Sequence, residues 1–174
     1  LLRSLNRLLG EDPGFRTEQL ITLNVSLPGL DEDMARQAER TAALVERVRS
    51  LPGVEQVASS SIAPMANSNS NAQIVPEGYE IRPGVPIPAA DYRAASPEFF
   101  ATMGIPILKG RTYNKTDGVI AAIALKDILK WFSAAHYQVV VNEEMARRFW
   151  PGQDPIGRRF RFGPPSMKGA WMSV

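Results

Sequence analysis

Apolar and polar residues alternate along the segment from Glu18 to Leu27. A period of two residues is typical of a strand that buries one of its faces. The apolar positions are Ile21, Leu23, Val25 and Leu27, and Pro28–Gly29 ends the pattern. We therefore expect a half-buried strand over residues 18–27.

The next pattern has the period of a helix. Its apolar side consists of Met34, Ala38, Thr41, Val45, Val48 and Leu51. Asp31 and Asp33 stand where an N-cap and a first-turn acid stabilise a helix, and Pro52–Gly53 ends it. The run from Val54 towards Ser61 predicts a second strand. Strand, helix and strand together predict a βαβ unit.

Two segments without a periodic pattern follow. The polar run from Asn67 to Asn71 predicts a loop that marks the boundary of a second lobe. The proline-rich run from Pro76 to Pro88 is expected to cross the surface in extended form. Each proline lacks a backbone donor, so this run is not expected in the centre of a sheet.

Short elements are predicted beyond the prolines. A strand over residues 90–95 leads into a short helix, with Ser96 as its N-cap and Pro97 at its first position. Gly104 ends this helix. A further short strand is expected over residues 105–108.

The longest apolar stretch lies between Asp117 and Tyr137, where Lys126, Asp127 and Lys130 are the only charges after Asp117. We interpret it as a helix. A helix of about 17 residues with three charges inside it is a poor membrane span. We expect it to be part of the core or a partner surface, with an interfacial helix as the weaker alternative.

The C-terminal part combines several local signals. A strand over residues 138–141 precedes Asn142, which can cap a helix over residues 143–149. Two turns rich in proline and glycine then lead into a strand over residues 158–162. In this strand the phenylalanines are expected to point inward and the arginines outward.

The composition is that of a globular domain. The chain has 174 residues, of which 44% are hydrophobic and 22% charged, with a formal net charge of +2. Such a length corresponds to one domain or two small lobes. There is no cysteine and one histidine, His136, which excludes disulfides, cysteine nucleophiles and multi-histidine metal sites.

Few side chains are candidates for catalysis. His136 is the sole imidazole base, and no hydrolase motif flanks it. Carboxylates cluster at residues 31–33 and 143–144, but both clusters fall in first turns, where the helix dipole accounts for them. Phosphate-binding glycine motifs are absent. We predict no catalytic residue, no metal site and no cofactor, and keep a hydrolase that uses His136 as the less favoured alternative.

Basic residues gather near the C-terminal end without an aromatic platform. They are Arg147, Arg148, Arg158, Arg159 and Arg161. Phe160 and Phe162 are expected in the core, so no stacking surface for bases accompanies the arginines. We interpret them as solvated faces and predict no nucleic-acid partner.

Several segments occur in an order that resembles one family. They are LLRSLNRLL followed by DPGF, QLITLNVSLP, VERVRSLPGVEQVA, SPEFFATMGIPILKGR and VVVNEEMARRFWPGQDPIGRRFRFG. The order resembles the extracytoplasmic core domain of MacB/FtsX-type ABC transporter permeases, in particular the duplicated orphan permeases of acidobacteria. The resemblance covers most of the chain, and its last two segments are the most specific.

The resemblance implies an α+β fold with two small subdomains, a porter-like βαβ lobe and an inserted mixed α/β lobe. The implied parts are the outer end of the first transmembrane helix (1–10), the first half of the porter-like lobe (11–65), the inserted lobe (66–165) and the start of the return strand to the porter-like lobe (166–174). Two features depart from the family pattern. One is the apolar insertion over residues 118–136, and the other is the missing second half of the porter-like lobe.

The resemblance also implies a function. The domain would be non-catalytic, would lie on the periplasmic face of the bacterial inner membrane, and would couple cytoplasmic ATP hydrolysis to movement of a substrate or partner outside the cytoplasm. Its implied partners are a separate cytoplasmic ABC ATPase subunit and the membrane, through flanking helices. A periplasmic partner protein and a homodimer are both left open.

Aromatic side chains are enriched at partner surfaces. The candidate interface residues are Trp131, Phe132 and Tyr137. The alternative function is a module that binds a small ligand in the cleft between the two lobes.

Overall fold

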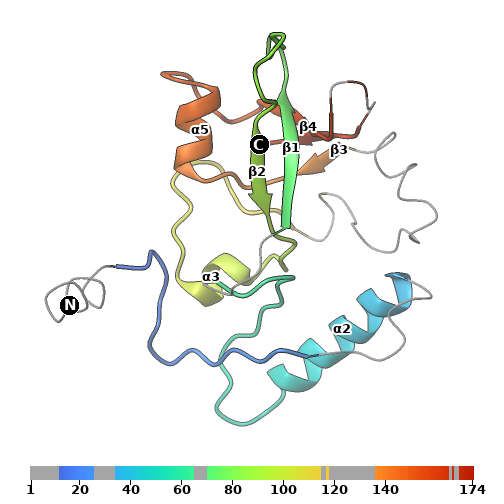
Figure 1. Cartoon of the computed structure of the whole chain (residues 1–174). Coiled ribbons are helices and arrows are strands. Elements are labelled where there is room, and N and C mark those ends of the chain that lie inside the picture. Colours follow the sequence, from blue (N-terminus) through green and yellow to red (C-terminus); the bar gives the residue numbers. More distant parts are fainter. Residues whose placement is uncertain are drawn as a thin grey trace, which may run out of the picture.

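The structure, a computed structural model, describes residues 12–25, 34–64, 70–114, 117, 136–164, 166 and 169–174, with only the backbone for residues 34–38 and 136. The fold is α+β, as predicted. A five-stranded mixed sheet carries α5 beside it, while α3 lies below the sheet and α2 at the foot of the molecule (Figure 1). No helix in these residues is long and apolar enough to cross a membrane.

The strands of the sheet are β1 (Ser70–Pro76), β2 (Ala89–Tyr92), β3 (His136–Gln138), β4 (Arg159–Phe162) and β5 (Trp171–Ser173). Their order is β2-β1-β4-β5-β3, with β3 parallel to β5 and every other pair antiparallel. Residues 171–173 therefore lie inside this sheet, between β4 and β3. By the predicted boundaries, these residues pair with strands of the inserted lobe, and the division of the chain into two lobes stays a prediction.

The register places apolar side chains on one face of the sheet. Phe160 pairs with Met172, which pairs on its other side with Tyr137. Ile74 pairs with Phe162 on the neighbouring strand. Ile74, Phe160, Met172 and Tyr137 are all buried and belong to one core cluster. This face is therefore the inner face of the sheet.

Helix α5 (Glu143–Phe149) covers that inner face, as the helix pattern predicts. Trp150, directly after the helix, is a member of the core cluster, and Met145 and Phe149 pack against it. The core thus joins the short helix α5, Trp150 after it and all five strands of the sheet, since Ala90 of β2 also packs against the cluster.

Strand β1 lies inside the sheet. Its first residues were predicted to belong to a polar loop, and its last residue, Pro76, was predicted to begin a run outside the centre of any sheet. Ser70 and Asn71 pair with β2, so the predicted loop over residues 67–71 is wrong at its end. Pro76 is the last residue of β1 and pairs with Phe160. The N–H of Ile74 points towards β2, where it donates to Pro88 O at 2.8 Å. Alternate residues point the same way, so the donor that Pro76 lacks would face the side where pairing with β2 has ended.

Helix α2 (Met34–Arg49) is confirmed, but the strands predicted on either side of it are wrong in the residues described. Residues 20–25 form no strand, and the segment 54–61 contributes a single bridge between Ser60 and Ala95. A strand requires a neighbour that supplies ladder hydrogen bonds, and no strand in the described part of the chain pairs with either segment. The predicted βαβ unit is therefore reduced to its helix.

Helix α3 (Phe99–Met103) ends at Gly104, as predicted, with Gly104 in the left-handed region at φ 66°. Its start differs from the prediction, because Glu98 and not Ser96 is the N-cap residue. The hydroxyl of Ser96 instead accepts a hydrogen bond from the N–H of Ser59 at 3.2 Å. Residues 105–108 form no strand, because no described strand pairs with them.

Candidate functional site

The segment from Asn142 to Phe162 uses its distinctive residues to hold its own geometry. Asn142 Oδ1 accepts a hydrogen bond from the N–H of Met145 at 2.9 Å, which satisfies one donor of the first helical turn. Asp154 Oδ1 accepts from the N–H of Ile156 at 3.1 Å. Gly157, at φ 79°, donates its N–H to Val174 O at 2.9 Å. These contacts fix the angle at which α5 joins β4.

The predicted interface residues are separated by the structure. Trp131 and Phe132 lie outside the described residues, as does most of the helix predicted between Asp117 and Tyr137. Tyr137 is in β3 and not at the end of a helix, and it is only 4% exposed within the core cluster. Burial raises the pKa of its hydroxyl. Tyr137 is a core residue, which does not fit the expectation of an exposed interface anchor.

His136, the one candidate base, is the first residue of β3 and pairs with Trp171. Only its backbone is described, so its side chain adds nothing to the hydrolase alternative. In the described part of the chain no cluster of three or more His, Cys, Asp and Glu side chains could hold a metal ion.

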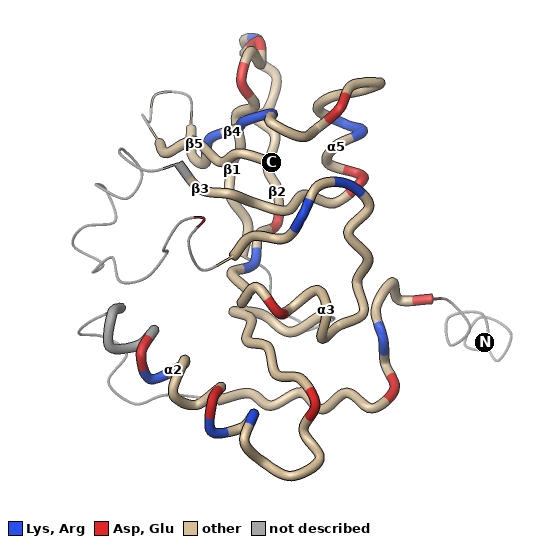
Figure 2. The backbone as a smooth tube through the Cα atoms, turned by 180° about the vertical axis from the view of Figure 1, so that it is seen from behind, with Lys and Arg blue, Asp and Glu red and all other residues tan. Residues whose placement is uncertain are grey.

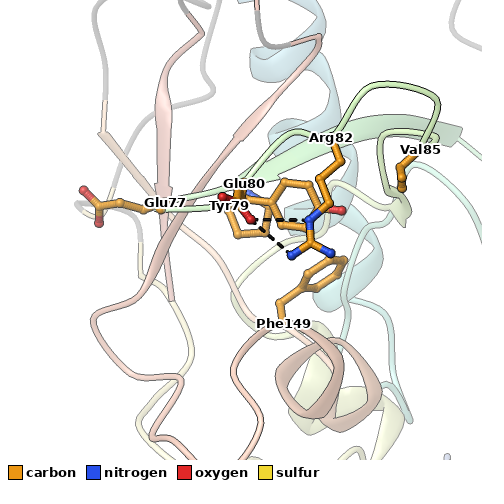
Figure 3. A pocket seen from close by; sticks show the side chains of 8 residues that line it. Glu77, Tyr79, Glu80, Arg82, Val85 and Phe149 are labelled. Atoms are coloured by element: carbon orange, nitrogen blue, oxygen red, sulfur yellow. Dashed lines mark hydrogen bonds and ion pairs between the residues drawn. The ribbon is translucent and has the colours of Figure 1, made fainter.

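A surface pocket lies between the β1–β2 loop and the C-terminal end of α5 (Figure 3). Its volume is ≈ 450 Å³. Its lining residues are Pro76, Glu77, Gly78, Tyr79, Glu80, Arg82, Val85 and Phe149. The sequence alone did not indicate this pocket, because one of its walls is the proline-rich run, which was predicted only to cross the surface.

The charged side chains around the pocket are largely paired. Glu77 binds Arg159 of β4 through two hydrogen bonds, of which Nε–Oε2 is 3.0 Å, and this contact lowers the pKa of Glu77. Glu80 binds Arg82 within the loop, with Nη2–Oε2 at 3.1 Å. The guanidinium of Arg148 lies over the Phe149 ring, 5.4 Å from its centroid.

The outer face of the sheet carries arginine and tryptophan side by side. The guanidinium carbons of Arg159 and Arg161 lie 5.0 and 4.8 Å from the centroid of the Trp171 ring. Basic positions therefore follow β4 (Figure 2). Both arginines lie on the face opposite Phe160, as predicted, but the interpretation of a solvated face does not hold for them. They are only partly exposed because they pack on the indole, and Nε of Arg161 is buried without a hydrogen-bond partner among the described residues.

An alternating apolar row is exposed at the N-terminal side. The exposed fractions of Ile21, Leu23 and Val25 are 86%, 73% and 50%. The chain just before this row is held to α3, because Arg16 N donates to Met103 O at 2.8 Å and Arg16 Nη2 to Thr102 O at 2.9 Å. The row is therefore an apolar surface on an anchored segment.

Comparisons of the chain with protein-family models, with curated protein sequences and with solved structures give no match. The resemblance to ABC transporter permeases therefore stays a prediction.

Proposed function

We propose that this chain is a non-catalytic extracytoplasmic domain of a MacB/FtsX-type ABC transporter permease. It lies on the periplasmic face of the bacterial inner membrane and moves with the transmembrane helices. A separate cytoplasmic subunit hydrolyses ATP, and the domain passes the resulting movement to a substrate or a partner protein.

The proposal rests mainly on the structural roles of the residues in the most family-specific segment, residues 142–162. Its Asn142 caps a helix, its Trp150 and Phe160 fill the core, and its Asp154 closes a turn. Each of these residues holds the helix, the turn or the sheet in place. A segment built in this way suits a body that transmits displacement, because a rigid connection between helix and sheet moves as a unit.

The exposed row of Ile21, Leu23 and Val25 supports the proposal independently. An alternating set of large apolar side chains at exposures of 50–86% is expensive to leave in water. Its exposure is expected if the domain works inside a larger assembly, where a neighbouring element covers the row. A domain that acts alone has no neighbouring element to cover the row and would not be expected to expose it.

The experiment follows two labels during the ATP cycle. One spin label is attached to a cysteine introduced at Glu143 in α5, which is exposed, and the other to a cysteine on the ATPase subunit bound to the full-length permease. Double electron–electron resonance then compares the nucleotide-free state with the state trapped by ATP and vanadate. We expect the distance distribution between the labels to shift on trapping. A distribution that is identical in the two states contradicts the mechanical role.

A further inference from the structure

We infer that the outer face of the sheet binds an acidic peptide segment of a partner protein through Arg161 and Trp171. The two residues are direct partners in the register of β4 and β5. Their neighbours Phe160 and Met172 belong to the core, so Arg161 and Trp171 stand on the opposite face of the sheet. This inference does not depend on the proposed function, because its observations concern the sheet alone.

Arg161 is a cation without a polar partner among the described residues. Its Nε is buried and has no acceptor there, and no ion pair or hydrogen bond joins its terminal nitrogens to a described group. These terminal nitrogens are not among the buried atoms, so an acceptor can reach them from solvent. A guanidinium that has lost part of its hydration gains from an oxyanion, because hydrogen bonds between charged groups are about twice as strong as neutral ones.

Trp171 holds this guanidinium in place. The guanidinium carbon of Arg161 lies 4.8 Å from the centroid of the indole ring, and that of Arg159 lies 5.0 Å from it. A guanidinium over a ring donates from its edge, so this contact leaves the terminal N–H groups of Arg161 for an acceptor. Because both side chains stand on paired strands, little conformational freedom is lost when the acceptor binds.

The charge on this face fits one carboxylate. Arg159 is neutralised by Glu77, so Arg161 is the unpaired charge of β4 and β5 among the described residues. Asp91, on the same face, is held by Asn71 at the β2 edge, two strands away from β4. A phosphate monoester carries a charge of about −1.5 to −2 at pH 7, and nucleic acids need several cations. One free guanidinium therefore favours a carboxylate over both.

The side chains of the site point to a protein partner. Tryptophan and arginine are enriched among the hot spots of protein interfaces. In the adjoining row Arg159 pairs with Ser173, which pairs with Gln138, and Gln138 is exposed. Hydroxyl and amide groups can bond the backbone of a peptide that crosses the strands. A peptide segment therefore contacts more of this face than an isolated carboxylate does.

The experiment titrates the ¹⁵N-labelled 174-residue chain at pH 7 with an acetylated and amidated hexaglutamate peptide. The indole N–H of Trp171 is followed by NMR, and the hexaglutamine peptide is the ligand control. We expect saturable shifts with hexaglutamate, and Arg161→Gln should lower the affinity about tenfold or more. Arg148→Gln is the matched control, because Arg148 makes no ion pair with a described residue and stands on α5, which covers the opposite face. We expect it to lower the affinity less than about twofold.

Circular dichroism shows whether Arg161→Gln folds. If it does not, Arg161→Lys takes its place, because it keeps the charge and loses the planar pair of donors, and the affinity should fall about threefold or more. Four outcomes overturn the inference. They are the lack of saturable shifts, equal affinities of the variants at positions 161 and 148, equal binding of hexaglutamine, and equal affinity for inorganic phosphate at the same ionic strength, which would assign the site to phosphate groups.

Discussion

Arg159 on β4 holds Glu77, the first residue after β1, by two hydrogen bonds, one of them 3.0 Å long. The backbone follows the same connection, because Glu77 N donates to Arg159 O at 2.8 Å. The side chains are partly exposed, at 38% for Arg159 and 47% for Glu77. This contact ties the start of the β1–β2 loop, and with it one wall of the pocket, to the middle of the sheet.

The pair predicts a pH dependence of stability. Arg159 lowers the pKa of Glu77 in the folded state, so the pair stabilises the fold above the unfolded pKa of about 4.3, and this stabilisation is lost as the pH falls through the folded pKa. We expect Glu77→Gln to lower the melting temperature at pH 7 and to have little effect near pH 2. A melting-temperature difference between the native chain and the variant that stays constant over this range would contradict the pairing.

The cap of α5 gives a second prediction. Asn142→Ala removes the oxygen that accepts from Met145 N, and we expect the free energy of unfolding to fall by about 1 kcal/mol. Asn142→Asp keeps a capping oxygen and should stay close to the native value. Urea denaturation at pH 7 measures both variants. Equal loss in the two would show that the cap is not the cause.

The packing of the core gives a third prediction. Phe160 is 4% exposed and pairs with both Pro76 and Met172, so Phe160→Ala leaves a cavity in the centre of the sheet. We expect a loss of about 3–5 kcal/mol. Leu108→Ala, at a side chain that is 70% exposed, is the control and should change stability by less than about 0.5 kcal/mol. Similar losses for the two would contradict the assignment of Phe160 to the core.

A fourth prediction concerns Asp117. Arg111 binds this carboxyl on both oxygens, Nη2–Oδ1 being 2.8 Å, and Asn114 N donates to it at 2.7 Å. These contacts lower the pKa of Asp117 from 3.8 to about 2. The carboxyl carbon of Asp117 should therefore titrate near pH 2 by NMR, and Arg111→Gln should move the titration up towards the usual aspartate range. A native titration near pH 4 would contradict the pair.

The sequence predicted the part from Asn142 to Phe162 well because its signals are local. The strand predicted just before it, over residues 138–141, is wrong: the strand observed there is β3, which ends at Gln138, and residues 139–141 form no strand. Asn142 lies directly before α5, proline and glycine mark the turns, and two phenylalanines alternate with arginines in β4. Each signal acts within four residues of its position, so no knowledge of distant strands is needed. The same holds for Gly104 at the end of α3.

The partners of each strand could not be predicted in this way. Residues 20–25 show clear alternation, yet alternation describes a suitable face and does not supply a neighbouring strand. β3 has three residues at the end of an apolar run, and a short apolar strand cannot be distinguished from the end of a buried helix by periodicity. Tyr137 was therefore expected on a surface and lies in the core.

The pocket was missed for a related reason. Its walls come from a loop at residues 77–85 and from Phe149, which is far away in the sequence. Only the antiparallel pairing of β1 with β2 and β4 brings the loop to the end of α5. The one local signal in the sequence was the presence of two apolar residues, Ile81 and Val85, in a run predicted to cross the surface, and the structure shows both to be exposed.

The location of the domain is the most direct test of the proposed function. Glu55 and Arg93 are exposed and make no ion pair with a described residue, so each can be replaced by cysteine in a chain that has none of its own. Intact cells that express the full gene product in a cysteine-free background are treated with a membrane-impermeant maleimide, with a cysteine on a cytoplasmic protein as the lysis control. We predict labelling of both positions before lysis, while the control stays unlabelled. Labelling of these positions only after lysis would place the domain in the cytoplasm and contradict the proposal.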